Sequence, residues 1–331
     1  MIISVNRPQQ SARDLFKHCF FGLLRVAHWD QVLLRGIRVR RLVSVVNLHR
    51  VSPHPNPFWS PMHPDVFEGL LKFFSKRAQV TTLRNRHLVP NERPAVIFSF
   101  DDGYADFLEY AMPLLQKYRV KANLNVICES ICNRTAPWNI QLYDFLNAAP
   151  RKLIKEIVLP GFNSQLNGDD VDNKRRYGLA LSRFLKLRSR KERLEHWNVI
   201  APIVKKLGNN NTTRMISLRD LQSIAHDHEI GAHSFSHESM GCEDNSFFAE
   251  DLGRCVTFFC KDLKLPLSIY AFPNGSYRYE QIEILRGRGI KHILLVGERL
   301  ASRSNPVCPR ITVFGDTTEE ACFRSLGVRA R

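Results

Sequence analysis

Hydrophobic and polar positions along the chain alternate in blocks that predict strands separated by helices. Short apolar runs typical of buried strands span residues 41–49, 96–100, 120–128, 229–233, 268–272 and 292–296. Patterns with the period of an amphipathic helix lie between them, over residues 65–77, 105–118, 217–228, 249–263 and 279–288. Strands that alternate with helices indicate an α/β protein with parallel strands.

Two stretches lie outside this alternation. Residues 1–40 form a basic N-terminal segment, within which residues 12–34 carry an apolar stripe at helical spacing. Such a helix can lie on an anionic membrane surface, or it can pack on its own domain; the pattern allows both. Residues 41–331 are expected to form the β/α domain, with an insertion at about residues 135–213.

The insertion is rich in Lys, Arg and Leu and has a helical pattern. It is interrupted at Pro160-Gly161 and at residues 208–211, where glycine and asparagine gather. We therefore expect a group of helices inserted into the β/α domain rather than a separate catalytic module.

Composition indicates a globular protein. The chain has 331 residues, of which 44% are hydrophobic and 24% charged. It contains no apolar run of about 18 residues, and its N-terminus lacks a secretory pattern. We expect a cytoplasmic protein, with peripheral contact at the inner face of the membrane if the N-terminal helix binds lipid.

The net charge of +16 favours anionic partners, or it reflects a basic solvated surface. Basic residues gather over residues 35–41, 174–176 and 186–193 without forming a single stripe. No nucleic-acid-binding module or interleaving of basic and aromatic residues is evident, so no nucleic-acid partner is expected. The eight cysteines form no Cys-x-x-Cys pair, which favours free thiols over a zinc ribbon.

Two adjacent carboxylates, Asp101 and Asp102, follow the strand expected over residues 96–100. Like charges this close disfavour joint ionisation unless a cation, a proton or an arginine offsets them. The pair can therefore mark a functional site. It can equally be the N-cap of the helix expected over residues 105–118, because Asp is a common N-cap residue.

A pair of histidines, His233 and His237, follows the short strand over residues 229–233. Imidazoles four residues apart can reach one metal ion, although histidines at this spacing also occur without one. Together with one of the two carboxylates they would make a three-ligand site with positions left open for water. The second carboxylate would then be free to accept a proton from that water.

Three motifs in this order resemble those of the polysaccharide deacetylases, the NodB-homology family (carbohydrate esterase family 4). Ser99-Phe-Asp-Asp-Gly103 is similar to the first motif and His233-Ser-Phe-Ser-His237 to the second, and Ala271-Phe-Pro-Asn-Gly275 resembles a divergent third. Asn47-Leu-His-Arg-Val51 is similar to an opening found in many bacterial members. The resemblance covers about residues 42–130 and 214–314.

The resemblance implies a distorted (β/α)7 barrel and a metal-dependent hydrolase that removes an N-acyl group from a sugar. A divalent metal, most often zinc, would be held by Asp102, His233 and His237, with Asp101 as the general base. The substrate would be an N-acylated sugar of a polysaccharide, an oligosaccharide or a lipid-linked glycan precursor. A cytoplasmic location favours a sugar precursor or a lipid-linked intermediate.

The sequence departs from the family pattern in its third motif and near its C-terminus. Members often have an arginine where Ala271 stands, to orient the base, and an aromatic where Asn274 stands. Asn274 retains the backbone N–H of that position, and Arg310 is our candidate for the missing arginine. No Leu-x-His motif supplies the general acid; His49 or His292 could replace it, or both could be structural, so this role is left unassigned.

These departures leave an alternative from another class. A catalytically degenerate carbohydrate-binding protein on the same barrel would keep the ligand residues and lose the reaction. The third hypothesis is a nucleic-acid-binding protein, which the net charge alone suggests.

Overall fold

Seven parallel strands form a closed barrel in the part of the chain that the structure, a computed structural model, describes: residues 12–208 and 213–329. The barrel strands are β1 (Leu42–Leu48), β3 (Ala95–Asp102), β4 (Asn123–Val126), β5 (Glu229–Ala232), β6 (Ile269–Ala271), β7 (His292–Val296) and β9 (Val307–Thr312). The barrel closes because β1 pairs in parallel with β3 on one side and with β9 on the other. The predicted (β/α)7 barrel is confirmed.

Two short strands extend the barrel at its margin. β2 (Gln79–Val80) pairs in parallel with the start of β3, and β8 (Ala301–Ser302) pairs antiparallel with the start of β1. Both therefore lie at the amino ends of the barrel strands, away from the carboxyl ends, where β/α barrels place their active sites.

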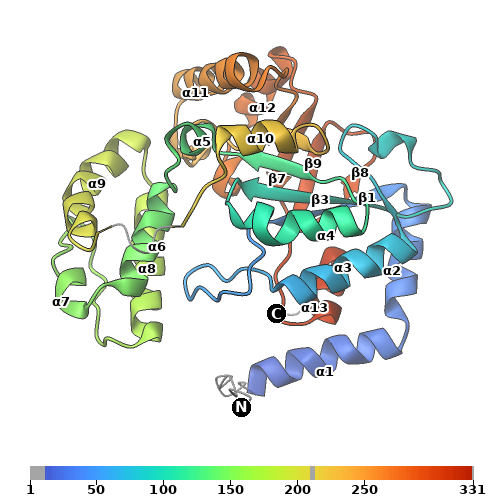
Figure 1. Ribbon diagram of the computed structural model, residues 1–331, viewed down its shortest axis with the longest axis horizontal. Coiled ribbons are helices and arrows are strands. Elements are labelled where there is room, and N and C mark those ends of the chain that lie inside the picture. Colours follow the sequence, from blue (N-terminus) through green and yellow to red (C-terminus); the bar gives the residue numbers. More distant parts are fainter. Residues whose placement is uncertain (1–11, 209–212, 330–331) are drawn as a thin grey trace.

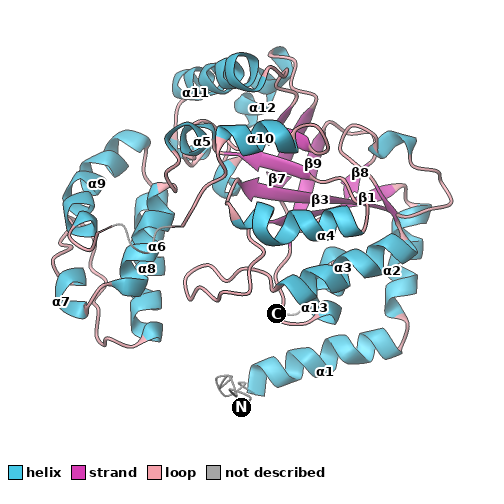
Figure 2. Ribbon diagram, in the orientation of Figure 1, coloured by secondary structure: helices cyan, strands magenta, loops and turns pink. Residues whose placement is uncertain are grey.

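Helices cover the outside of the barrel, as the surrounding cyan ribbons show in Figure 2. The α-helices of this layer are α3 (Pro64–Arg77), α4 (Met112–Lys117), α5 (Cys128–Asn133), α10 (Leu218–Ile224), α11 (Asn245–Phe258), α12 (Tyr279–Gly287) and α13 (Thr318–Ser325). Single-turn π-helices adjoin two of them, Phe107–Ala111 before α4 and Phe259–Leu263 after α11. Shorter 3₁₀ turns span Arg86–Leu88, Met240–Cys242 and Pro273–Gly275.

Packing of β3 against α3 shows why the apolar run folds as a central strand. Every residue of β3 is buried. The ring of Phe67 on α3 packs edge-on against Phe98 and Phe100 of β3, with centroids 6.1 and 5.7 Å away. Buried aromatic side chains of this size supply a large share of the apolar area that stabilises the barrel.

The N-terminal segment forms two helices, α1 (Ala12–Val26) and α2 (Trp29–Val39), rather than one. They are separated at His28, whose φ of 55° is left-handed. One side of α1 packs on the barrel layer, because Phe21 is fully buried and stacks on Phe323 of α13 at 6.2 Å. Other apolar side chains of α1 remain exposed, namely Leu15, Phe16, Leu23 and Val26.

Within the described residues, no helix is both long enough and apolar enough to cross a membrane. All eight cysteines lie in the described ranges and are free thiols.

The insertion contributes α6 (Trp138–Ala148), α7 (Arg151–Ile154), α8 (Val171–Lys186) and α9 (Arg190–Lys205), which stand to one side of the barrel (Figure 1). Their apolar faces share a core of their own, which includes Leu142, Leu146, Leu181, Leu185 and Ile200. The insertion is joined to the barrel by more than its two chain connections. Arg193 of α9 and Glu238, just beyond the second histidine, form a buried ion pair in which Nε donates to Oε2 at 3.0 Å.

Candidate active site

Asp101 and Asp102 are the last two residues of β3, and their exposed fractions are only 1% and 4%. The helical segment that follows begins at Phe107, with Asp106 at its N-cap position. The interpretation of the aspartate pair as a helix cap is therefore wrong. Both carboxylates lie instead at the carboxyl end of the barrel.

Asp101 is held by a buried arginine from β9. Nη1 of Arg310 donates to Oδ1 of Asp101 at 2.5 Å and to Oδ1 of Asn47 at 2.8 Å, and the Arg310 side chain is fully buried. Nδ2 of Asn125 donates to the same Asp101 oxygen at 2.8 Å. Burial by itself would raise the pKa of Asp101, but the charges of Arg310, His233 and His49 and the hydrogen bond from Arg310 together hold that pKa well below its usual range.

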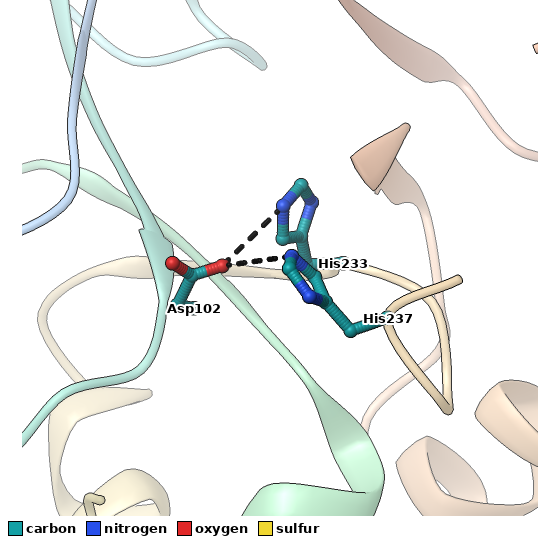
Figure 3. Close-up of side chains that lie close together, drawn as sticks. All are labelled: Asp102, His233 and His237. Carbon is teal, nitrogen blue, oxygen red and sulfur yellow. Dashed lines mark ion pairs between the residues drawn. The ribbon is translucent and has the colours of Figure 1, made fainter. Parts of the chain in front are cut away.

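Asp102 faces the two histidines. Its Oδ1 lies 3.5 Å from Nε2 of His233 and 3.4 Å from Nε2 of His237, as the dashed lines of Figure 3 show. This buried oxygen has no hydrogen-bond partner among the described residues. The neighbouring imidazoles outweigh the effect of burial and lower the pKa of Asp102, so the carboxylate is ionised.

His233 is oriented through its second ring nitrogen. Nδ1 lies 2.9 Å from the carbonyl oxygen of Ala271, and because a carbonyl can only accept, the proton sits on Nδ1. Nε2 therefore presents its lone pair toward Asp102. Burial lowers the pKa of His233 to about 4, against the opposing effect of the two aspartates, which keeps the ring neutral at pH 7.

The loop that carries His237 is fixed by a buried carboxylate from α11. Asp251 accepts hydrogen bonds from the backbone N–H of Phe235 at 2.8 Å and of Ser236 at 3.1 Å. It also accepts from Oγ of Ser236 at 2.6 Å. The backbone N–H of His237 donates to Oγ of Ser234 at 2.6 Å, which closes the turn between the two histidines.

Left-handed backbone conformations gather at this end of the barrel. Asp102 has φ of 76°, His237 has 59° and Asn274 has 55°, although none of them is glycine. Such conformations cost on the order of 1–3 kcal/mol each and persist where the surrounding structure imposes them, often at functional sites.

A divalent metal fits the cluster of Asp102, His233 and His237. One ligand atom from each residue lies within 4.8 Å of the others. The unpartnered Oδ1 of Asp102 and the Nε2 lone pair of His233 face the same point. Two imidazoles and a carboxylate form a donor set that zinc prefers.

The cluster opens into a cavity of about 210 Å³. Its walls include Trp59, Asp101, Asn274 and Lys186 in addition to the three candidate ligands. Asn274 lies in the Pro273–Gly275 turn after β6, and its Nδ2 donates to Oγ of Ser239 at 3.3 Å. The structure thus brings all six sequence-predicted site residues to one end of the barrel.

The two candidates for the general acid are far apart. His49 lines the cavity, with its Nε2 3.9 Å from Oδ2 of Asp101 and its ring edge-on to Trp59 at 5.0 Å. His292 starts β7 at the opposite end of the barrel, where its Nδ1 lies 2.7 Å from Nη1 of Arg86. His292 is therefore excluded from this site by its position.

Sequence reasoning missed the asparagines that support Asp101. Asn125 alternates with apolar residues in β4, and the strand is buried on both faces. Its Nδ2 donates to Asp101 and also to Oγ of Ser99 at 3.1 Å inside the barrel. A polar residue repeated every second position in an otherwise apolar strand was the available signal.

No family model and no curated protein matches this sequence. Solved structures do match. The deacetylase PplD from Streptococcus pyogenes, solved in complex with acetate, superposes with a TM-score of 0.55 at 16% identity, covering 86% of this chain and 98% of that one. IcaB from Ammonifex degensii gives a TM-score of 0.54 at 15% identity, covering 86% of this chain and 97% of that one.

A third match is the polysaccharide deacetylase BC0361 from Bacillus cereus, with a TM-score of 0.54 at 12% identity, covering 86% of this chain and 69% of that one. At these identities the likeness establishes the fold. The resemblance to the polysaccharide deacetylases that the sequence motifs indicate is therefore confirmed for the fold.

Proposed function

We propose that this chain, which has the (β/α)7 barrel fold of the polysaccharide deacetylases, is a metal-dependent hydrolase that removes an N-acyl group from a sugar. The single observation that carries the proposal is the buried cluster of Asp102, His233 and His237 beside a second, arginine-bound carboxylate, Asp101. The solved PplD holds acetate, which supports N-acetyl as the acyl group.

Asp102, His233 and His237 would hold the metal, and their two imidazoles and one carboxylate favour zinc. A bound divalent metal lowers the pKa of water and polarises an acyl carbonyl.

Asp101 would act as the general base. Its Oδ1 is occupied by Arg310 and Asn125, so Oδ2 is the oxygen that accepts the proton of the attacking water. Arg310 contributes to keeping Asp101 ionised and would orient it through the contact with Oδ1, which is the role that the resemblance implies for the arginine absent at Ala271.

The remaining roles go to residues on the cavity wall. The backbone N–H of Asn274 would stabilise the oxyanion, as a turn amide facing a site can. His49 would donate the proton to the leaving amine, because it is the one of the two predicted histidines that lines the cavity.

A degenerate carbohydrate-binding protein remains the second candidate. Ala271 and the absence of a Leu-x-His motif for the general acid are the sequence features that favour it. The contact between Arg310 and Asp101 supports the enzyme over this alternative, because Arg310 makes up for the loss at Ala271. Sugar binding without acyl release from a broad panel would favour the binding protein.

The test is an acyl-release assay on N-acetylglucosamine oligosaccharides and on lipid-linked N-acetylated sugars. Wild-type protein should release acetate, and Asp101→Asn should bind metal equally but lose turnover by at least about a hundredfold, because general-base catalysis contributes about 10²–10⁴-fold. Asp65→Asn is the matched control, since that side chain is 88% exposed on α3. Full activity of Asp101→Asn would remove the base assignment.

We also propose a peripheral contact between α1 and an anionic membrane surface. Phe16 and Val26 are 72% and 77% exposed although Phe21, on the same helix, is buried. Apolar side chains on a basic helix are suited to the boundary between headgroups and acyl chains. This contact would bring the barrel to lipid-linked substrates.

A further inference from the structure

A second cavity, of about 590 Å³, adjoins the candidate active site. Its walls come from the insertion, from the loop after β1 and from the loop after β9. The two cavities share wall residues, including His49, Trp59 and Lys186. A substrate whose acyl group reaches Asp102 therefore has room to extend into the larger cavity.

One face of α8 forms the basic wall of this cavity. Arg175, Leu179, Arg183 and Lys186 all line it, and their spacing of four, four and three residues places them on one side of the helix. The face is thus built to present three cations toward the cavity.

Two of these cations are not engaged elsewhere. In the described ranges, Arg175 and Arg183 have no hydrogen-bond or ion-pair partner, whereas Arg50 on the opposite wall is bonded to Asp106 at 2.6 Å. The acidic residues of the wall, Asp316 and Glu320, already lie within 3.9 Å of Nζ of Lys17. The free charge facing the cavity is therefore positive.

The remaining wall is apolar and aromatic. Phe58, Trp59 and Met62 contribute from the loop after β1, and Phe314, which is 58% exposed, contributes from the loop after β9. A cation cluster beside an apolar groove suits a ligand that joins an anionic group to a hydrocarbon chain. A neutral sugar polymer has no group that would use Arg175 and Arg183.

We propose that the larger cavity binds a phosphate group attached to the N-acylated sugar, with Arg175 and Arg183 as its ligands, and that the apolar wall receives a hydrocarbon chain linked through that phosphate. The inference rests on the proposed function, because it names the substrate class of the same site. Arginine is suited to this role because its guanidinium binds phosphate oxygens in pairs. Lys186, between the two cavities, contacts the link between phosphate and sugar.

Binding is measured first, without any reaction. Calorimetric titration with geranyl phosphate and with inorganic phosphate should show binding of both, tighter for geranyl phosphate. The double variant Arg175→Gln/Arg183→Gln should weaken binding by at least about tenfold, since hydrogen bonds to charged groups contribute about 1.5–3 kcal/mol each. Arg176→Gln, at the adjacent exposed position of α8, is the control and should bind as wild type does.

Acyl-release rates then distinguish a sugar phosphate from a lipid-linked sugar phosphate as the ligand of the larger cavity. Acyl release is compared for neutral chitotriose, N-acetylglucosamine 1-phosphate and geranyl-phospho-N-acetylglucosamine. The double variant should lose the preference of wild type for the phosphorylated substrates by at least about tenfold in kcat/KM, whereas Arg176→Gln should keep that preference. A higher kcat/KM for the geranyl substrate than for the sugar phosphate supports the hydrocarbon subsite, and equal values overturn that part.

Failure of the inference differs from failure of the proposed function. The inference is overturned if kcat/KM for acyl release is the same with and without phosphate on the substrate and the double variant binds phosphate as tightly as wild type does. The proposed function is unaffected by that result. Arginine-dependent phosphate binding without acyl release from any substrate retains the phosphate site and overturns the function.

Discussion

The Arg310 side chain enters the barrel from β9 and neutralises Asp101, a carboxylate that is 99% buried. The departure at Ala271 made Arg310 the candidate for this contact, although β9 lies far from β3 along the chain. Only the closure of the barrel through β1 brings the two strands to a common centre. Arg310 therefore supplies the buried cation beside Asp101 that we propose in place of the arginine expected at Ala271.

Replacing Arg310 should destabilise the fold. Arg310→Met leaves the Asp101 charge buried without a partner, and we expect the free energy of unfolding to fall by about 3–5 kcal/mol. Urea denaturation measures this loss. Adding Asp101→Asn should recover part of it, because the unpaired charge is then removed.

The exposed residue Arg288 gives the matched control, and Arg288→Met should change the free energy of unfolding by less than about 0.5 kcal/mol. Equal losses for the Arg310 and Arg288 variants would show that the buried pair contributes nothing to stability.

His292 should make stability depend on pH. Burial and, after it, the charge of Arg86 lower the pKa of His292 to about 4. Above pH 6.5 the ring is neutral in both states, but between pH 6.5 and 4 the unfolded chain binds a proton that the native protein does not, so stability falls as the pH falls. His292→Asn keeps an acceptor for Arg86 and should lose less stability between pH 7 and pH 5 than wild type.

The measurement is urea denaturation at both pH values, with His226→Asn at an exposed position as the control. Parallel losses in wild type and His292→Asn would contradict this role of His292.

At the scale of elements, strands marked by apolar runs could be predicted, whereas β9, which lacks such a run, could not. β7 was predicted with its observed bounds because it is short and apolar. β9 was not predicted, because it contains Pro309 and Arg310, which argue against a buried strand from sequence alone. The fully buried Arg310 shows that long-range pairing, rather than local preference, decides this strand.

Contacts that depend on long-range strand pairing also limited the prediction of the site. The motif order identified the two aspartates and two histidines, whose chemistry is visible in their residue types. Asn47 and Asn125 could not be assigned roles, because their contacts with Arg310 and Asp101 depend on the radius of the closed barrel.

Close packing inside the barrel should make Gly231 of β5 intolerant of a side chain. A Cβ at this position would overlap Oδ1 of Asn125 and lie 2.7 Å from Cγ2 of Ile269. We expect Gly231→Ala to reduce the free energy of unfolding by about 1–3 kcal/mol and to lower acyl release, because Asn125 must move away from Asp101.

Thermal or urea unfolding together with the acyl-release assay checks this prediction. Gly253→Ala on α11 is the control, since a Cβ there meets nothing within 4 Å and alanine favours a helix by about 1 kcal/mol. A Gly231 variant with the stability and activity of wild type would show that the barrel interior is looser than its contacts indicate.

At the scale of the whole molecule, the barrel, the insertion and α1 present different surfaces. The insertion supplies the basic face of α8 beside the site, whereas α1 lies below α3 and α13 in Figure 1 with apolar residues exposed. A membrane contact through α1 and a phosphate-binding cavity under α8 would act on the same amphipathic substrate.

The membrane contact predicts lipid binding that depends on exposed residues. Wild-type protein should sediment with vesicles containing phosphatidylglycerol, and Phe16→Glu/Leu23→Glu should sediment much less, because both side chains are about 70% exposed and would have to enter the lipid boundary. Val158→Glu, at a residue of the insertion that is 74% exposed, is the control. Equal sedimentation of all three proteins would remove α1 from membrane binding.

The central claim is that Asp102, His233 and His237 hold a divalent metal on which acyl release depends. Elemental analysis of the purified protein by mass spectrometry, combined with the acyl-release assay before and after chelation, tests it most directly. We predict about one zinc ion per chain, loss of activity when it is removed, and recovery when zinc is returned. Full acyl release by metal-free protein would contradict the account.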